Sequence, residues 1–175
     1  MTKTPSLCLA FVIILFSVTS LAQDRGSLTL GYGFAVLSEN SNIGKIEEGN
    51  YDFVQLSYIF EKPLTEKLAF LVEPFAAYVN RPHSGVEGGI VLSGKYYFRE
   101  KQRNGFYLTL GGGGAYTSIN FEEQGTHGLF ILQGGIGFKW KEFFIENRLR
   151  HYSNGGTAQP NKSINSNIIV VGMDF

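Results

Sequence analysis

A histidine and a serine stand two residues apart in the stretch His151-Tyr152-Ser153-Asn154, near the end of the chain. Residues i and i+2 of a β-strand point to the same face, so in a strand this imidazole and this hydroxyl are close neighbours. A histidine that takes the proton of a serine turns the hydroxyl into a nucleophile, as in ester hydrolysis. The spacing therefore predicts a base and nucleophile pair, provided that the stretch is a strand.

The N-terminus has the layout of an export signal. A positive charge precedes the apolar run 7–16, and small residues ending at Ala22 precede a polar stretch. This order is typical of a secretory signal peptide, and the apolar run is too short for the roughly 20 residues of a transmembrane anchor. We expect 1–22 to be cleaved, with 23–175 as the mature chain. Cys8, the only cysteine, lies in the leader, so the mature protein would have no disulfides and no thiol chemistry.

The composition is rich in glycine and aromatic residues and poor in charge. The chain has 22 Gly, 15 Phe and 9 Tyr, and 17% of its residues are charged. Without the single basic residue of the leader, 14 of the 15 basic residues remain, against 15 acidic ones. The mature chain thus has no excess of positive charge that would indicate nucleic-acid binding. About 150 residues make one domain. This balance favours a transmembrane barrel over a soluble globule.

Eight segments after the leader alternate with a period of two, as β-strands with two different faces do. In the first, Leu28, Leu30 and Tyr32 alternate with Thr29, Gly31 and Gly33. The segments exceed the five or six residues of a typical soluble strand and suit a tilted membrane crossing. They run roughly over 27–38, 51–62, 67–80, 86–99, 105–118, 128–140, 142–153 and 166–175.

One face of the segments carries large apolar residues, and the other carries small or polar residues with single charges such as Glu73, Glu87 and Lys139. The second face is too small and too polar for a soluble core. In a closed barrel its charges pair inside the lumen, and closure leaves no unpaired strand edge in the lipid. The sequence predicts an all-β protein, an eight-stranded antiparallel transmembrane β-barrel. A soluble exported barrel is the alternative interpretation. The terminal Phe175 resembles the signal that the outer-membrane insertion machinery reads.

The connections between the segments give an orientation. Those at 61–66, 100–104 and around Lys141 are short, whereas those at 39–50, 119–127 and 154–165 are long. The link at 81–85 is shorter than the other long ones. Outer-membrane barrels keep short turns in the periplasm and long loops outside, so both chain ends are expected on the periplasmic side.

This orientation places the pair. The segment 142–153 rises toward the outer surface, with Leu149, His151 and Ser153 on its apolar face and Arg148 and Arg150 on the other. The pair is therefore expected to face lipid near the outer-leaflet boundary. A nucleophile placed there suits a hydrolase that cuts a lipid rather than a water-soluble molecule.

The motif His151-Tyr152-Ser153-Asn154 and the pair Pro160-Asn161 together resemble the lipid A 3-O-deacylases of Gram-negative outer membranes, also described as acyloxyacyl hydrolases. Members have eight-stranded barrels with a His-x-Ser-Asn motif on a late strand and a Pro-Asn pair shortly after it. Only 149–165 carries the specific resemblance. It implies an outer-membrane esterase that removes an ester-linked acyl chain, 3-O-linked, from lipid A or lipopolysaccharide without a cofactor.

The resemblance also implies roles for single residues. Ser153 would be the nucleophile and His151 its general base, while Asn154 and Asn161 would shape an oxyanion pocket with the backbone at Gly155-Gly156.

The third member of the expected triad departs from the family pattern. The family has a glutamate five residues after the proline, where this chain has Asn165. An amide can orient the imidazole but cannot stabilise an imidazolium by charge. Glu122 and Glu123, in a neighbouring outer loop, are acidic alternatives. A non-catalytic structural or adhesin-like barrel that retains the motif is therefore the second hypothesis.

Other candidate features carry less chemistry. His83 and His127 lie in outer loops with no cysteine or paired histidine at ligand spacing, so no metal site is expected. The run Gly111-Gly112-Gly113-Gly114 opens no helix, and we interpret it as a crowded or bent strand rather than a phosphate cradle. Lys45 and Arg81 are candidates for contacts with lipid phosphates. A homodimer is an assembly that the sequence leaves open.

Overall fold

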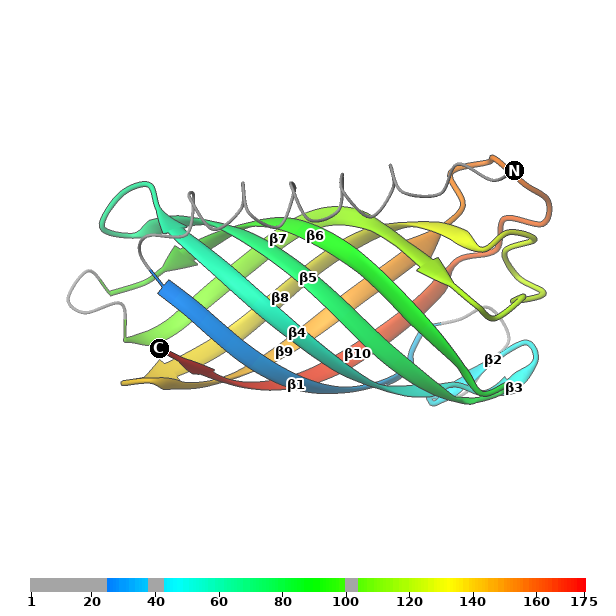
Figure 1. Ribbon diagram of the computed structural model, residues 1–175, viewed down its shortest axis with the longest axis horizontal. Coiled ribbons are helices and arrows are strands. Elements are labelled where there is room, and N and C mark those ends of the chain that lie inside the picture. Colours follow the sequence, from blue (N-terminus) through cyan, green and yellow to red (C-terminus); the bar gives the residue numbers. More distant parts are fainter. Residues whose placement is uncertain (1–24, 38–42, 100–103) are drawn as a thin grey trace, which may run out of the picture.

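The computed structural model describes residues 25–37, 43–99 and 104–175, which form a closed antiparallel barrel (Figure 1). Each strand pairs with its neighbour along the chain, and the last strand pairs with the first, with Val171 opposite Leu30. The predicted eight-stranded antiparallel barrel is confirmed. The strands are β1 (Arg25–Ala35), β4 (Asp52–Pro63), β5 (Leu68–Arg81), β6 (Gly85–Tyr97), β7 (Gly105–Thr117), β8 (Gly128–Trp140), β9 (Phe143–Ser153) and β10 (Ile164–Asp174).

The strand bounds differ little from the prediction, with one addition. β1 ends at Ala35 rather than 38, and β10 begins at Ile164 rather than 166. The connection 39–50 contains a small hairpin of β2 (Lys45–Ile46) and β3 (Gly49–Asn50). The sequence did not predict this hairpin, because strands of two residues are too short to show an alternation. The predicted signal peptide with Cys8 lies outside the described residues, as do parts of the connections at 39–50 and 100–104. In the described part of the chain, no helix is long and apolar enough to span a membrane.

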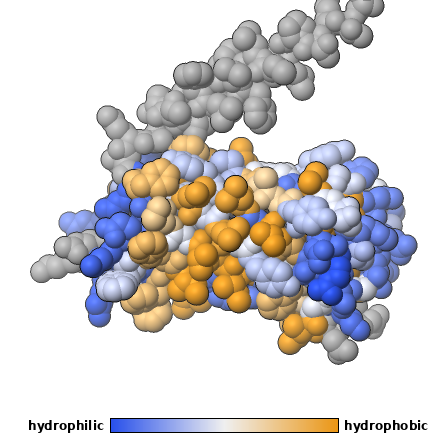
Figure 2. Space-filling view, turned by 60° about the horizontal axis from the view of Figure 1, so that its bottom comes forward, coloured by the Kyte–Doolittle hydropathy of each residue, from blue (hydrophilic) through white to orange (hydrophobic). Residues whose placement is uncertain are grey.

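Large apolar side chains cover the outside of the barrel. Leu30 and Leu132, for example, are 53% and 59% exposed. Figure 2 shows an apolar zone across the middle of the molecule, with hydrophilic surface at both ends. Such a zone between two polar ends is the surface that a bilayer solvates. The long loops and the β2–β3 hairpin lie at one end, and the C-terminus lies at the other (Figure 1).

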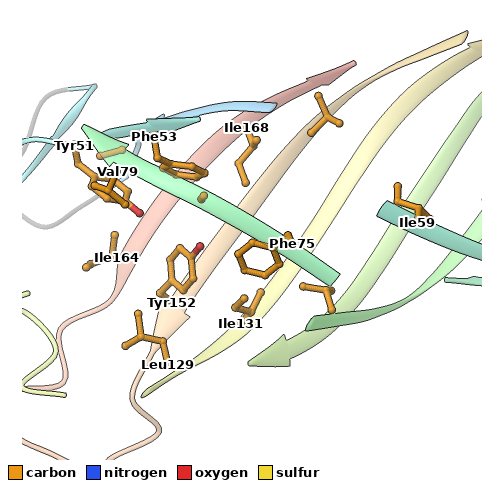
Figure 3. Packing of buried hydrophobic residues seen from close by; sticks show 14 of the residues in the cluster. Tyr51, Phe53, Ile59, Phe75, Val79, Leu129, Ile131, Tyr152, Ile164 and Ile168 are labelled. Carbon is orange, nitrogen blue, oxygen red and sulfur yellow. The ribbon is translucent and has the colours of Figure 1, made fainter. Parts of the chain in front are cut away.

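The interior of the barrel is filled with side chains. Arg148 is buried, and its guanidinium donates hydrogen bonds of 2.8 Å to Glu73 and 2.9 Å to Glu146. The predicted pairing of inward charges is confirmed. The prediction of only small and polar inward residues is wrong, however, because Phe53 and Phe75 also fill the lumen (Figure 3). An eight-stranded barrel is just wide enough for side chains to fill, so bulky residues pack there as well.

The glycine run in β7 is crowded on one side only. A Cβ added at Gly113, which faces inward, would lie 2.0 Å from the carbonyl oxygen of Ile90. At Gly114, which faces outward, the nearest atom would be the carbonyl oxygen of Leu129 at 3.6 Å. The interpretation as a crowded strand therefore holds for the inward glycines, where backbone and side chains leave no room for a methyl group.

This asymmetry makes a stability prediction. We expect Gly113→Ala to lower the free energy of unfolding by about 2 kcal/mol, since overpacking forces backbone shifts, and Gly114→Ala to leave it nearly unchanged. Urea-induced unfolding from lipid vesicles measures both variants. An equal loss in the two would contradict the assignment of the crowding to the inward face.

Candidate active site

His151 and Ser153 lie at the end of β9 that leads into the long connection before β10, on its lipid-facing side, as the alternation predicted. Both are half-buried, whereas Arg150 and Tyr152 point into the lumen and are fully buried. The Tyr152 hydroxyl accepts a hydrogen bond of 3.0 Å from Arg150 and donates one to Glu87 (the side chain appears in Figure 3). The residue between the pair is thus anchored inside the barrel, which holds the backbone of the pair in place.

Asn165 lies directly opposite His151 in the register of β9 and β10. The Nδ1 atom of His151 is 2.8 Å from Oδ1 of Asn165, and Nδ2 of Asn165 donates a hydrogen bond of 3.2 Å to the carbonyl oxygen of Leu37. Because a carbonyl can only accept, this second bond places the amide oxygen toward the histidine. His151 therefore carries its proton on Nδ1, which leaves the lone pair on Nε2.

The Ser153 hydroxyl is held by the following loop rather than by His151. It donates a long hydrogen bond of 3.4 Å to Oδ1 of Asn161 and accepts one of 2.9 Å from the N–H of Gly155. The N–H of Asn154 donates to the same Asn161 oxygen at 3.0 Å, which fixes the orientation of that amide. Within the described residues, Nδ2 of Asn161 makes no hydrogen bond. No hydrogen bond joins Ser153 and His151 in this conformation.

The Asn154 side chain holds the loop after β9 in place. This role differs from the one expected for it, which was to shape an oxyanion pocket. Its amide nitrogen donates to the carbonyl oxygens of Gln124 at 2.6 Å and of Ala158 and Pro160 at 3.0 Å. Its amide oxygen accepts from the N–H of Gly156 at 2.8 Å. Both of its N–H groups are therefore engaged. Sequence reasoning missed this role because its partners are backbone carbonyls, which carry no sequence signal.

The turn after Asn154 requires its two glycines. Gly155 and Gly156 have φ angles of 62° and 80°, in the left-handed region that side chains disfavour. A Cβ at Gly155 would also lie 2.8 Å from the ring of Phe130. The turn folds the loop back so that Asn161 reaches Ser153.

The acidic alternatives do not join the site. A carboxylate oxygen of Glu123 accepts a hydrogen bond of 2.8 Å from the N–H of Glu47. Burial raises the pKa of the Glu123 carboxyl, and the nearby charge of Glu48 raises it further. Neither Glu122 nor Glu123 makes a hydrogen bond with His151, whose partner is Asn165.

The histidines of the outer loops have other partners. His83 Nε2 lies 3.6 Å from a carboxylate oxygen of Glu48, and His127 Nδ1 lies 2.9 Å from the carbonyl oxygen of Thr117. Residues 25–37, 43–99 and 104–175 contain no group of three or more His, Cys, Asp or Glu side chains that could hold a metal ion.

The two cations proposed to meet lipid phosphates are differently placed. Arg81, the last residue of β5, pairs with Asp52 at 2.6 Å, so its charge is already compensated. Lys45 is exposed on β2. Contact between either residue and a phosphate stays a prediction.

A closed eight-stranded barrel with an apolar outer surface and a polar, charged lumen defines the class of small outer-membrane β-barrels. A family model for lipid A 3-O-deacylases (PagL) matches residues 50–174, and the chain belongs to that family. The resemblance read from the motif is thereby confirmed. The chain is an outer-membrane barrel of a lipid A deacylase family. No curated protein matches the chain.

Solved structures share the fold. The crystal structure of the outer membrane enzyme PagL superposes with a TM-score of 0.63 at 19% identity, covering 84% of this chain and 98% of that one. The N-terminal barrel of Pseudomonas aeruginosa OprF gives a TM-score of 0.55 at 14% identity, with 87% and 98% covered. Ail of Yersinia pestis gives 0.54 at 12% identity, with 86% and 99% covered. At these identities the likeness shows the barrel fold alone.

Proposed function

We propose that this chain hydrolyses the ester that links a 3-O acyl chain to lipid A, with Ser153 as nucleophile, His151 as general base and Asn165 as the residue that orients the imidazole. The observation that carries the proposal is the 2.8 Å contact between His151 and Asn165, which leaves Nε2 as a base on the face that Ser153 shares.

Acylation proceeds by addition to the ester carbonyl and then elimination of the sugar oxygen. Nε2 of His151 takes the Ser153 proton while Oγ bonds to the carbonyl carbon, and the carbonyl oxygen becomes an oxyanion. When the tetrahedral intermediate collapses, the bond from carbon to the sugar oxygen breaks, and the imidazolium returns its proton to that oxygen. In this scheme, the hydroxyl leaves its long bond to Asn161 and turns toward His151 when substrate binds, since catalytic hydrogen bonds often tighten only in the complex.

Deacylation repeats the step with water. His151 takes a proton from water as the oxygen attacks the acyl-enzyme, and Ser153 regains its proton when the fatty acid leaves. The oxyanion needs N–H donors in both steps. We assign this role to the amide of Asn161, whose Oδ1 lies 3.4 Å from Oγ and whose Nδ2 turns to the oxyanion once the hydroxyl has left Oδ1. The N–H of Gly155, which donates to Oγ in this conformation, is the second donor and turns to the oxyanion in the same step. Asn154 supports the pocket through the loop instead.

The substrate class follows from the surface around the pair. Phe130 and Leu132 of β8 lie directly opposite Ser153 and His151 and are each 59% exposed. An acyl chain embedded in the leaflet can lie along this apolar surface with its ester at the rim. A lipid that carries ester-linked acyl chains below a polar head group meets both requirements, as lipid A and phospholipids do. The family to which the chain belongs favours lipid A over phospholipid as the substrate.

Reconstituted barrel and purified lipid A test the proposal. We expect the product to lose the mass of one hydroxyacyl chain, with the free fatty acid recovered, and a bilayer of ordinary phospholipid to stay intact. If lipid A keeps its mass in the presence of the folded barrel, the result would favour a non-catalytic structural or adhesin-like barrel. That second hypothesis arises because Asn165 stands where the family has an acidic residue. The Ser153→Ala barrel is the matched control.

A further inference from the structure

Leu37 has an unusual backbone conformation beside the candidate site. It follows the end of β1, and its φ angle of 54° lies in the left-handed region, which non-glycine residues rarely adopt. Its side chain is 80% exposed, so packing of the side chain does not account for the conformation. Backbone strain of this kind is often found where a structure positions a functional group.

The backbone around Leu37 is bonded to Asn165. The N–H of Val36 donates a hydrogen bond of 2.9 Å to the carbonyl oxygen of Asn165, and the carbonyl oxygen of Leu37 accepts one of 3.2 Å from Nδ2 of the same residue. The second bond requires the Leu37 carbonyl to point toward β10, and it does so with Leu37 in the left-handed conformation. Asn165 is thus held through both its backbone and its side chain.

We propose that Leu37 is a positioning residue whose backbone carbonyl orients the Asn165 amide and thereby fixes the protonation of His151 at Nδ1. The inference rests on the proposed function of the site. The relay runs from the Leu37 carbonyl through Asn165 to His151, and its only polar contributions are a backbone oxygen and a neutral amide. The Leu37 side chain takes no part.

This relay also gives a physical reason for an amide at position 165. A carboxylate there offers only acceptor oxygens, so the oxygen facing Leu37 would meet a carbonyl oxygen at hydrogen-bond distance without a proton between them. An asparagine satisfies both neighbours at once, because it accepts from His151 and donates to Leu37. The residue that departs from the family pattern is matched to the loop conformation of this chain.

A matched pair of variants tests the role of the backbone. Leu37→Gly removes the side chain but adopts a positive φ freely, so we expect kcat to stay within about twofold. Leu37→Val keeps an apolar side chain, but a β-branched residue disfavours the left-handed region, and we expect kcat to fall by about tenfold with KM nearly unchanged. A role for the side chain predicts the reverse order, with glycine harmful and valine harmless, and would overturn the proposal.

The tautomer of His151 gives a readout that does not depend on activity. In barrels labelled with ¹⁵N-histidine, with the His151 signal assigned from a His151→Gln variant, we expect the Nδ1–H form in wild type and Leu37→Gly, and a loss of that form in Leu37→Val. If His151 keeps the Nδ1–H tautomer in a folded Leu37→Val barrel, the proposed role of Leu37 is wrong, even if the esterase is active. An inactive wild type with the expected tautomers would instead contradict the proposed function alone.

A double-mutant cycle tests whether Leu37 acts through residue 165. Asn165→Asp removes the donor to Leu37, so the tenfold effect of Leu37→Val on kcat should disappear in the Asn165→Asp background, since the two changes act on one bond. Independent, multiplying effects would show that Leu37 does not act through residue 165.

Discussion

Replacing Ser153 with alanine is expected to lower kcat for ester hydrolysis by about 10⁴-fold or more, the loss seen when a serine hydrolase loses its nucleophile. We expect a loss of kcat this large because the variant must hydrolyse the ester by a different mechanism. Without Oγ no acyl-enzyme forms, and water must attack the ester directly, helped only by His151 and the oxyanion donors. The mass assay with reconstituted lipid A, run as a time course, measures the ratio of the two rates.

A control separates chemistry from loop structure, because Ser153 also accepts the hydrogen bond from Gly155. Ser163→Ala changes an exposed serine of the same connection and should leave kcat unchanged. Equal melting temperatures of the two variants would show that the loop change does not unfold the barrel. Retention of a tenth or more of the wild-type kcat by Ser153→Ala would exclude Ser153 as the nucleophile.

Replacing Arg148 with methionine is expected to lower the free energy of unfolding by about 3 to 5 kcal/mol, the cost of removing one partner from a buried ion pair. Arg148 is 1% exposed and lies between Glu73 and Glu146, each 2% exposed. Its loss leaves two carboxylates in the lumen without their cation, and methionine cannot replace the hydrogen bonds. Urea-induced unfolding from vesicles measures the change.

The adjacent residue is the matched control. Leu149 faces lipid on the same strand, and Leu149→Met should change the free energy of unfolding by less than about 1.5 kcal/mol, as volume-conserving apolar exchanges do. If Arg148→Met were as stable as Leu149→Met, the lumen network would contribute little, and water inside the barrel would have to solvate both carboxylates.

The barrel and the faces of its strands were predictable from the alternation alone. A strand turns each successive side chain to the opposite face, so the placement of Arg148 inside and of His151 and Ser153 outside follows from their parity in the chain. The alternation of short and long connections likewise put the pair at the rim with the long loops. The size of the inward residues was misjudged, since Phe75 and Tyr152 also fill the narrow lumen.

The partners of the pair were decided by the tertiary structure. Asn165 was a candidate by motif, but its contact with His151 depends on the register of β9 and β10, which a shift of one residue would abolish. Asn154 turned out to hold the loop, because its amide meets carbonyl oxygens that belong to two separate connections. Hydrogen bonds from a side chain to the backbone of another loop depend on how the loops pack together, which the sequence pattern does not show.

By itself, the sequence determined that this chain is a membrane barrel with a histidine and a serine on its lipid-facing rim, because strand periodicity and loop length are local properties. Only the tertiary structure decided which ring nitrogen of His151 faces Asn165, since that contact crosses the sheet from β9 to β10. Asn165 is held in turn by a bond to Leu37, which stands 128 positions before it in the chain. The bond from Asn165 to Leu37 exists because the barrel closes β10 onto β1, and closure is a property of the whole chain.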